Sequence, residues 1–574
     1  MSPPLPNLET FPPLRAWQRK AMVTYLRQRS EDFMAVATPG AGKTTFALRI
    51  AAEMLTDGTC DAVTVVCPTE HLKTQWSLAA ARVGIQLDPK FRNSDVHSSR
   101  DFHGAVLTYA QVGMAPAVHK RRTITRRTFV ILDEIHHAGD SRTWGDGVKD
   151  AFEPAVRRLL LTGTPFRSDE NPIPFVTYER GPDGVQRSRA DSVYGYADAL
   201  RDRVVRPVLF MAYSGETRWR TNAGDELAAR LGEPMTKDVV AQAWRTALDH
   251  RGDWMPQVLR AADARLSKLR EHGMPDAGGL IIASDQQSAR AYAKLIHDIT
   301  GESATVVLSD DEGASGRIAT FAASEQRWMV AVRMVSEGVD IPRLAVGVYA
   351  TSASTPLYFA QAIGRFVRSR VEGETATVFL PSVPHLLGLA SEMEEQRNHV
   401  LGAPKEKDGL DDDLIERAQK SEDALGELEK QFEALSATAE LDQVIYDGTS
   451  FGTGARSGTA EELDYLGLPG LLTPEQVTEL LNKRQSEQLA AQKRQQPAEA
   501  AVPEQREPVV PMSAGERRNS LRRQLNTLVA AHHHRTNLPH GKIHAELRRL
   551  CGGPPSAQAT IEQLEERIAT IQTL

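Results

Sequence analysis

Cysteine is scarce in this chain, with Cys60, Cys67 and Cys551 as the only thiols among 574 residues. So few thiols cannot build a disulfide framework, and a reducing compartment fits such a sequence. Long apolar runs are also missing, because no stretch reaches the roughly 18 apolar residues that a membrane span requires. The N-terminal segment has no basic region followed by an apolar one, so it does not resemble a secretion signal. We therefore expect a cytoplasmic protein that has no membrane partner.

A strong net charge is absent as well. The formal net charge of −7 at pH 7 offers no general attraction to nucleic acid, so any such contact has to come from local basic surface. With 41% hydrophobic and 25% charged residues, the composition is that of a large soluble protein with several cores. Charge and composition thus allow several domains and indicate no substrate.

The first informative stretch is MAVATPGAGKTTFALRI, residues 34–50. An apolar strand runs into a glycine-bearing turn, and a helix with apolar residues on its inner side follows. This pattern is typical of a phosphate loop, in which backbone N–H groups at the helix start face the phosphates of a nucleotide. Lys43 would reach the β and γ oxygens, and the Thr44 hydroxyl would bind Mg²⁺. The loop residues predicted to bind ATP are Thr38, Pro39, Gly40, Ala41, Gly42, Lys43, Thr44 and Thr45.

A second stretch, RRTFVILDEIHHAGD at residues 126–140, supplies what a phosphate loop still needs. Its apolar run ends in Asp133, which would bind Mg²⁺ through water, and Glu134 would polarise the attacking water. A zinc site is the competing interpretation of His136 and His137. Adjacent histidines lack the separation of three or four residues that puts two ligands on one helix face, and no cysteine flanks them. We therefore interpret the stretch as the second half of a nucleotide site.

A short segment upstream of the loop, LRAWQ at residues 14–18, bears on which nucleotide is bound. The side-chain amide of Gln18 has a donor and an acceptor, and the edge of adenine offers the complementary pair. ATP is therefore favoured over GTP. Arg15 and Gln18 join the residues that are predicted to bind ATP.

The order of the remaining short segments narrows the interpretation. Beyond the loop come VVCPTEHLKTQW (65–76), VLTYAQ (106–111), LTGTPFR (161–167), GLIIAS (279–284), VSEGVDIP (335–342) and QAIGRFVR (361–368). With these segments in this order, residues 14 to about 380 resemble helicase superfamily two, the DEAD/DEAH-type nucleic-acid motors, with DEIH as the second carboxylate motif. The chain is similar to the XPB and RadD-like branch and also resembles the helicase subunits of type III restriction enzymes.

The resemblance implies an α/β fold of two tandem RecA-like domains with parallel sheets, and ATP and nucleic acid would bind along their shared cleft. Short apolar runs separated by helical patterns agree with this architecture. The domains expected from the sequence are a first RecA-like domain at 1–205, a second at 206–385 with a helical insertion near 220–272, an acidic helical region at 386–480, a disordered linker at 481–511 and a basic helical module at 512–574.

The acidic region is expected to contain an amphipathic helix. Residues 405–442 are rich in acids, and Leu425, Leu428, Phe432 and Leu435 recur at helical spacing. The segment after residue 485 has too few aromatic residues to build a core, so it is predicted to be a linker. The basic module that follows would bind nucleic acid, or dock on the acidic helix and offer a surface to a protein partner.

The resemblance also gives roles to residues of the second domain. Gln361, Arg365 and Arg368 match the family's sixth motif, and the spacing of three residues puts both arginines on one face of a helix. Arg368 would act as the arginine finger that stabilises charge on the transferred phosphoryl group. Gly338 would let the backbone approach the γ-phosphate, while Asp340 would fix a ribose or the sixth-motif arginines. The expected catalytic residues are Lys43, Asp133, Glu134, Gln361, Arg365 and Arg368.

Coupling and strand contacts follow from the same resemblance. The residues expected to link the carboxylates to the nucleic-acid side are His136, Thr162 and Thr164. Nucleic-acid contacts in this family are mostly to phosphates, so they would be largely indifferent to sequence. They are expected at Pro68, Thr69, Thr108, Ser284 and Ser336. A basic cluster at 119–127 is either a solvated loop or a further DNA contact.

The sequence thus predicts an ATP-dependent helicase or translocase that requires Mg²⁺ and acts on nucleic acid, with DNA favoured over RNA, in repair, recombination or defence. One alternative is a DNA-stimulated ATPase that remodels protein–DNA complexes without separating strands. Another is the motor subunit of a restriction-like complex, with the C-terminal region as its partner-binding surface.

Overall fold

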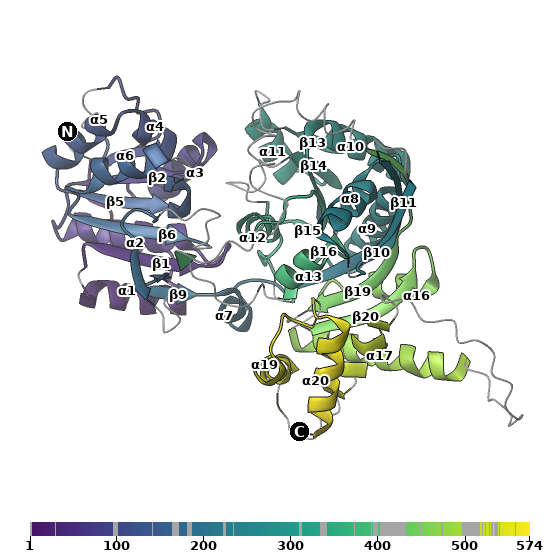
Figure 1. Cartoon of the computed structure of the whole chain (residues 1–574). Coiled ribbons are helices and arrows are strands. Elements are labelled where there is room, and N and C mark those ends of the chain that lie inside the picture. The colour runs from purple at the N-terminus through teal and green to yellow at the C-terminus, as the bar shows by residue number, and fades with distance from the viewer. Residues whose placement is uncertain are drawn as a thin grey trace, which may run out of the picture.

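The computed structural model describes residues 3–28, 30–95, 101–139, 142–163, 172–180, 186–221, 226–233, 235–308, 313–332, 341–371, 373–391, 393, 400–401, 432–446, 449–471, 474–495 and, with gaps, 517–573. These residues form two α/β lobes and a small helical module at the C-terminal end (Figure 1). Among the described helices, none is both long and apolar enough to cross a membrane.

The first lobe is built on a seven-stranded sheet in which every pairing is parallel. In sheet order its strands are β3 (Leu87–Asp88), β4 (Gly104–Thr108), β2 (Ala62–Cys67), β5 (Thr128–Asp133), β6 (Arg157–Thr162), β1 (Asp32–Ala37) and β9 (Ser192–Tyr194). Strands β2, β4 and β5 are buried along their whole length, which explains their continuous apolar sequences. The carboxyl ends of parallel strands meet at one edge, so this edge is where a site is expected.

Helices and short 3-10 turns surround this sheet. They are η1 (Leu8–Thr10), α1 (Ala16–Gln28), α2 (Lys43–Thr56), α3 (Glu70–Arg82), α4 (Tyr109–Met114), α5 (Pro116–Thr125), η2 (Ile135–Gly139), α6 (Arg142–Phe152) and α7 (Tyr196–Arg201). The central helix α2 buries Phe46, Ala47 and Ile50, the side that its sequence predicted.

The second lobe contains a ten-stranded mixed sheet. Its parallel part, in order, is β13 (Thr305–Val307), β14 (Trp328–Val332), β12 (Gly278–Ala283), β15 (Leu344–Ala350), β16 (Ala376–Pro381) and β10 (Val208–Thr221). Four further strands pair antiparallel: β11 (Glu226–Leu231), β18 (Phe432–Ala437) and β19 (Glu440–Tyr446) with β10, and β20 (Thr449–Arg456) with β19. The prediction of an α/β fold with two RecA-like domains is therefore confirmed.

Eight helices are described in and directly after this lobe. They are α8 (Lys237–Leu248), α9 (Trp254–Glu271), α10 (Gln286–Thr300), α11 (Ala314–Ala322), α12 (Pro356–Ile363), α13 (Pro384–Ser391), α16 (Ala460–Leu466) and α17 (Pro474–Gln495). A separate small sheet joins β7 (Thr177–Arg180), β8 (Gln186–Arg189) and β17 (Val400–Leu401).

The prediction of an amphipathic helix in residues 405–442 is wrong for the part of this segment that the structure describes. Phe432 and Leu435 belong to strand β18, and residues 440–442 belong to β19. The apolar spacing is compatible with a helix, but the long strand β10 offers an open edge, and pairing with it satisfies the backbone of these residues. Leu425 and Leu428 lie outside the described residues.

Two other boundaries also differ from the prediction. The insertion near 220–272 begins as a β-hairpin, because Glu226–Leu231 pairs antiparallel with β10 before helices α8 and α9 follow. The linker expected from residue 481 is helical as far as Gln495, the end of α17. Its Gln, Ala, Lys and Arg residues favour a helix, and the buried Val477 and Leu481 anchor that helix. Residues 496–511 lie outside the described residues.

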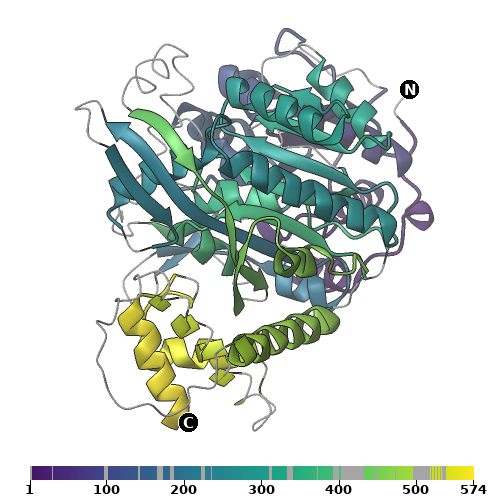
Figure 2. The same ribbon diagram turned by 90° about the vertical axis from the view of Figure 1, so that its right-hand side faces the viewer.

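The C-terminal module packs below the second lobe (Figure 2), and its helix α19 (His540–Cys551) contacts β20. Its own small core includes Ile543 and Leu547 of α19 and Leu564 and Ile568 of α20 (Ile561–Thr573). The helical character that the sequence predicts for this module is thus seen in the residues that are described.

Candidate nucleotide site between the lobes

The predicted phosphate loop connects β1 to α2 at the carboxyl edge of the first sheet. Gly40 and Gly42 have φ angles of 80° and 93°, in the left-handed region that glycine adopts without strain. Trp17 Nε1 donates a hydrogen bond of 3.0 Å to the carbonyl of Ala41, and Arg15 donates one of 2.9 Å to Gly40. The carbonyls of the loop are therefore held from the side of α1, which leaves the N–H groups at the start of α2 for phosphate oxygens.

Gln18 holds the same loop, which its predicted role did not include. Its Nε2 donates a hydrogen bond of 2.8 Å to the Gly42 carbonyl, and its Oε1 accepts one of 2.7 Å from the Arg15 N–H. At 2% exposed, the side chain is part of the loop's support. Adenine recognition by Gln18 stays a prediction, and it would have to use the second N–H and the second lone pair of the same amide.

Lys43 and the DEIH carboxylates meet at the mouth of the loop. Lys43 Nζ lies 2.7 Å from Glu134 Oε1, and the backbone N–H of Gly163 donates a hydrogen bond of 2.9 Å to Glu134 Oε2. Glu134 has a φ of 48°, a left-handed conformation that is uncommon outside glycine, directly after β5 ends. This turn brings the Glu134 carboxylate to the loop while Asp133 stays buried in the strand.

The pKa values of the two neighbouring carboxylates are shifted in opposite directions. The pKa of Asp133 is raised to about 6, first by burial and then by the adjacent charge of Glu134. Burial also acts to raise the pKa of Glu134, but the charges of Lys43 and His136 and the hydrogen bonds to Lys43 and Gly163 outweigh it, so the pKa is lowered to about 2. Glu134 therefore stays ionised and able to orient water at neutral pH.

The residues at this edge suit Mg²⁺ and ATP. The carboxylate of Asp133 and the hydroxyl of Thr44, in the first turn of α2, are the oxygen ligands that Mg²⁺ prefers. A Cβ atom built on Gly163 would lie 3.0 Å from Lys43 Nζ, so a side chain there would intrude on the lysine that faces the phosphates. The donor set and the glycine-lined space thus fit a Mg–nucleotide.

The coupling residues of the two lobes are in contact. His136 Nδ1 lies 2.9 Å from Thr162 Oγ1 and 3.7 Å from Glu134 Oε2. On its other side, Gln361 Nε2 from α12 lies 3.3 Å from His136 Nε2 and 3.3 Å from His137 Nε2. The histidines thus serve contacts between lobes, a role that the zinc alternative did not consider. Thr164 lies outside the described residues.

The sixth-motif arginines do not share a helix face, so that prediction is wrong. Helix α12 ends at Ile363 with Gly364 as its C-cap, and Arg365 lies in the following turn. Arg368 pairs through its backbone with Val205 in an isolated antiparallel bridge. This extended segment runs beside the phosphate loop, since a Cβ built on Gly40 would lie 3.9 Å from Arg368 Cα.

Arg368 is also close enough to the loop to act on it electrostatically. Burial lowers the pKa of Arg15, and the nearby charge of Arg368 lowers it further, although Tyr194 counteracts them. A second-lobe arginine therefore lies at the nucleotide edge of the first lobe. Gly338 and Asp340 lie outside the described residues.

The predicted nucleic-acid residues follow strand ends in both lobes. Pro68 and Thr69 follow β2, with Thr69 as N-cap of α3, and Thr108 accepts a hydrogen bond of 3.1 Å from the Gln111 N–H at the start of α4. Ser284 follows β12 and accepts one of 3.3 Å from the Ser352 N–H. Ser336 lies outside the described residues. Strand contact by these residues stays a prediction.

The basic cluster at 119–127 forms most of helix α5 and is not the solvated loop of the first alternative. Several of its cations have partners within the lobe. Lys120 lies 2.7 Å from Asp150, and Arg127 lies 2.8 Å from Asp61. Arg122 stacks over Phe91 at 3.9 Å from the ring centroid. These contacts leave less free charge for DNA than the sequence suggests.

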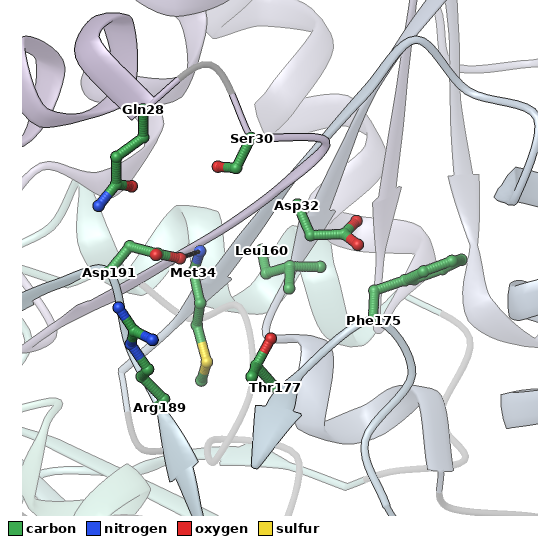
Figure 3. A pocket seen from close by; sticks show the side chains of 9 residues that line it. All are labelled: Gln28, Ser30, Asp32, Met34, Leu160, Phe175, Thr177, Arg189 and Asp191. Carbon is green, nitrogen blue, oxygen red and sulfur yellow. Dashed lines mark hydrogen bonds between the residues drawn. The ribbon is translucent and has the colours of Figure 1, made fainter. Parts of the chain in front are cut away.

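A cavity of about 270 Å³ lies elsewhere in the first lobe, along the first half of β1. Figure 3 shows Arg189 and Asp191 on one side of it and Phe175 on the other. The carboxylate of Asp191 accepts a hydrogen bond of 2.8 Å from the Met34 N–H, so it covers a strand edge that β9 leaves unpaired. None of its lining residues belongs to the phosphate loop.

The two RecA-like lobes, the phosphate loop and the carboxylates that face it are the architecture of helicase superfamily two, and the comparisons with known proteins support that class for this chain. Residues 12–167 match the family described as the res subunit of type III restriction enzymes. The chain belongs to the same family as a Mycobacterium tuberculosis protein described as "Uncharacterized protein Rv2917". The two are 59% identical over 573 residues, which cover 99% of this chain and 94% of that protein.

A more distant relative is the "DNA 3'-5' translocase XPB2" of Sulfurisphaera tokodaii, which is 24% identical over 396 residues that cover 64% of this chain and 81% of that protein. Among solved structures, the "ATP-dependent Type ISP restriction-modification enzyme LlaBIII bound to DNA" aligns with a TM-score of 0.43 and 14% identity. This alignment covers 64% of this chain and 27% of that enzyme, so the chain spans about a quarter of its length.

Proposed function

We propose that this protein is a DNA motor, which hydrolyses ATP between its two lobes to translocate along DNA or to separate its strands. The observation that carries the proposal is the contact of Gln361 with His136 and His137, because it joins the second lobe to the DEIH segment. A change at the nucleotide can thereby be passed to the relative position of the lobes. The name of the XPB2 relative supports DNA as the track.

The geometry suggests a division of roles in ATP hydrolysis. Lys43 would bind phosphate oxygens. A γ-phosphate would therefore compete with Glu134 for the Lys43 ammonium group. Glu134 is held on one oxygen by Lys43 and on the other by Gly163, so its carboxylate has a fixed direction in which to orient water. Thr44 and Asp133 would hold Mg²⁺, which neutralises charge on the phosphates. Arg368 would reach the developing charge from the second lobe.

The test is ATP hydrolysis measured with single-stranded DNA, double-stranded DNA and RNA, beside strand displacement on forked, tailed and blunt duplexes. We expect DNA to stimulate hydrolysis more than RNA, with Glu134→Gln as the inactive control. Stimulation without displacement would exclude strand separation and leave translocation or the remodelling of protein–DNA complexes, and stimulation by RNA alone would contradict the proposal.

A motor subunit of a restriction-like complex is the second candidate, and the match of residues 12–167 to the res-subunit family favours it. In that case the C-terminal region would bind the partner. Purification of the tagged full chain from cells of its source would separate the two candidates, because only the second predicts a nuclease that remains bound through gel filtration.

A further inference from the structure

Asp133 is held by two side chains that belong neither to the phosphate loop nor to strand β5. The indole Nε1 of Trp76 donates a hydrogen bond of 2.8 Å to Asp133 Oδ2. The hydroxyl of Tyr109 donates one of 2.8 Å to the main-chain carbonyl of Asp133. Trp76 is 2% exposed and Tyr109 is 1% exposed, so water cannot replace either hydrogen bond to Asp133. The side chain and the backbone of Asp133 are therefore each fixed by a buried donor.

These donors lie on helices that begin at predicted nucleic-acid residues. Helix α3 has Thr69 as its N-cap, and Trp76 lies seven residues further on, about 10 Å along the axis. Tyr109 is the first residue of α4 and directly follows Thr108, the N-cap of that helix. The strands that lead into the two helices, β2 and β4, are neighbours in the sheet. A shift at the start of either helix would therefore move a hydrogen-bond donor of Asp133.

We propose that Trp76 and Tyr109 are positioning residues, which orient Asp133 for Mg²⁺ and connect it to the nucleic-acid face of the first lobe. The inference rests on the proposed function, since it requires a Mg–nucleotide in the phosphate loop. With Oδ2 held by the indole, the Asp133 carboxylate keeps a fixed direction toward the metal or its water shell. Partners that orient a metal ligand in this way usually change metal affinity by about 10- to 100-fold.

The main test is Trp76→Phe, which keeps an aromatic ring in the core and removes the N–H donor. Mn²⁺ binding is followed by electron paramagnetic resonance in the presence of a non-hydrolysable ATP analogue. We expect Mn²⁺ affinity to fall by about 10- to 100-fold. Affinity for a fluorescent ATP analogue in EDTA should change by less than about twofold, because the phosphate loop itself is untouched.

Tyr109→Phe removes only a hydroxyl and is the second variant. Its bond goes to the main chain of Asp133, so the expected loss of Mn²⁺ affinity is smaller, about 2- to 10-fold. In both variants, DNA should stimulate ATP hydrolysis less than in the wild type even at saturating Mg²⁺, because a helix no longer transmits its position to Asp133. Full stimulation would refute the connection to the nucleic-acid face.

Trp254→Phe is the matched control. Trp254 is 1% exposed, and its indole donates a hydrogen bond of 3.1 Å to the carbonyl of Ser214 in the second lobe. Loss of the Trp254 N–H donor should lower folding stability by as much as loss of the Trp76 donor. It should leave Mn²⁺ affinity unchanged.

Two results would overturn the assignment of Trp76. One is an Mn²⁺ affinity equal to that of the wild type, and the other is a parallel loss of ATP affinity in EDTA, which would make the residue a support of the fold alone. If Trp76→Phe does not fold, unchanged Mn²⁺ affinity in Tyr109→Phe overturns the proposal instead. A wild type that binds no Mn–nucleotide would refute the proposed function itself.

Discussion

Glu374→Gln is predicted to weaken the segment that carries Arg368 to the phosphate loop. Arg206 and Glu374 are 1% and 2% exposed, and Arg206 Nη1 lies 3.3 Å from Glu374 Oε2. The side-chain Nε of Arg206 also donates a hydrogen bond of 2.6 Å to the Phe366 carbonyl. The backbone N–H of Arg206 donates one of 2.8 Å to the Val367 carbonyl. Arg206 thus anchors the two residues before Arg368, and Glu374, which also pairs with Arg370 at 2.9 Å, supplies its counter-charge.

The magnitude follows from what remains after the substitution. Burial lowers the pKa of Arg206 and the charge of Glu374 counteracts part of this shift, so the pKa is about 10 and the guanidinium remains charged at neutral pH. Removing one partner of a buried ion pair costs about 3–5 kcal/mol, because the other charge stays buried without compensation. The amide of glutamine still accepts one hydrogen bond, so we expect the lower end of this range, about 3 kcal/mol.

Urea unfolding of the second lobe measures this loss, and the transition of each lobe has to be followed separately, because a protein of several domains need not unfold in one step. Glu179→Gln is the control, since Glu179 pairs with Arg189 at 2.9 Å on the surface, where such a pair contributes at most about 1 kcal/mol. ATP turnover should fall with little change in ATP affinity. A loss of stability no larger than that of the control would refute the reasoning.

Three further substitutions test the nucleotide site. Glu134→Gln should keep ATP binding and abolish turnover, because the amide preserves shape but no longer orients water; a wild-type rate in a steady-state assay would contradict this role. Arg368→Ala should slow hydrolysis by a factor on the order of 10³ with ATP affinity nearly intact, and a change in DNA binding alone would make it a strand contact. Gln18→Ala should lower thermal stability by about 1 kcal/mol, since the Gly42 carbonyl loses its donor, and should weaken ATP binding measured by calorimetry. If GTP binding weakens less than ATP binding, the amide also reads adenine, and no effect on either nucleotide would remove Gln18 from the site.

Local motifs made the α/β fold and the carboxyl-edge site predictable, because the chemistry is contained in contiguous residues. A phosphate loop needs a strand, glycines and a helix start within one segment, and 34–50 contains all of them. The contacts that support the site were not predictable in this way. Trp76 and Asp133 are 57 residues apart, and Arg206 and Glu374 are 168 residues apart, so only the folded chain shows that they meet.

The errors at α12 and β18 have a common physical cause. Spacing of three and four residues is compatible with a helix, but it does not exclude an extended chain where a partner strand is available. The backbone of Arg368 pairs with Val205, and strand Phe432–Ala437 pairs with β10. In both places the partner comes from a distant part of the sequence, and tertiary pairing decides the conformation over local pattern.

The same reasoning changes what the basic C-terminal module is expected to do. Its excess of arginine suggested phosphate contacts, but Arg522 is 2% exposed and Arg567 is 0% exposed. Arg567 donates to the carbonyls of Gly552 and Pro554 within the module. Burial lowers the pKa of Arg518, and the charge of Asp442 on β19 counteracts this. These cations support the module and its packing on the second lobe, so they are not available to DNA, and docking on the motor explains them better than a free basic tail.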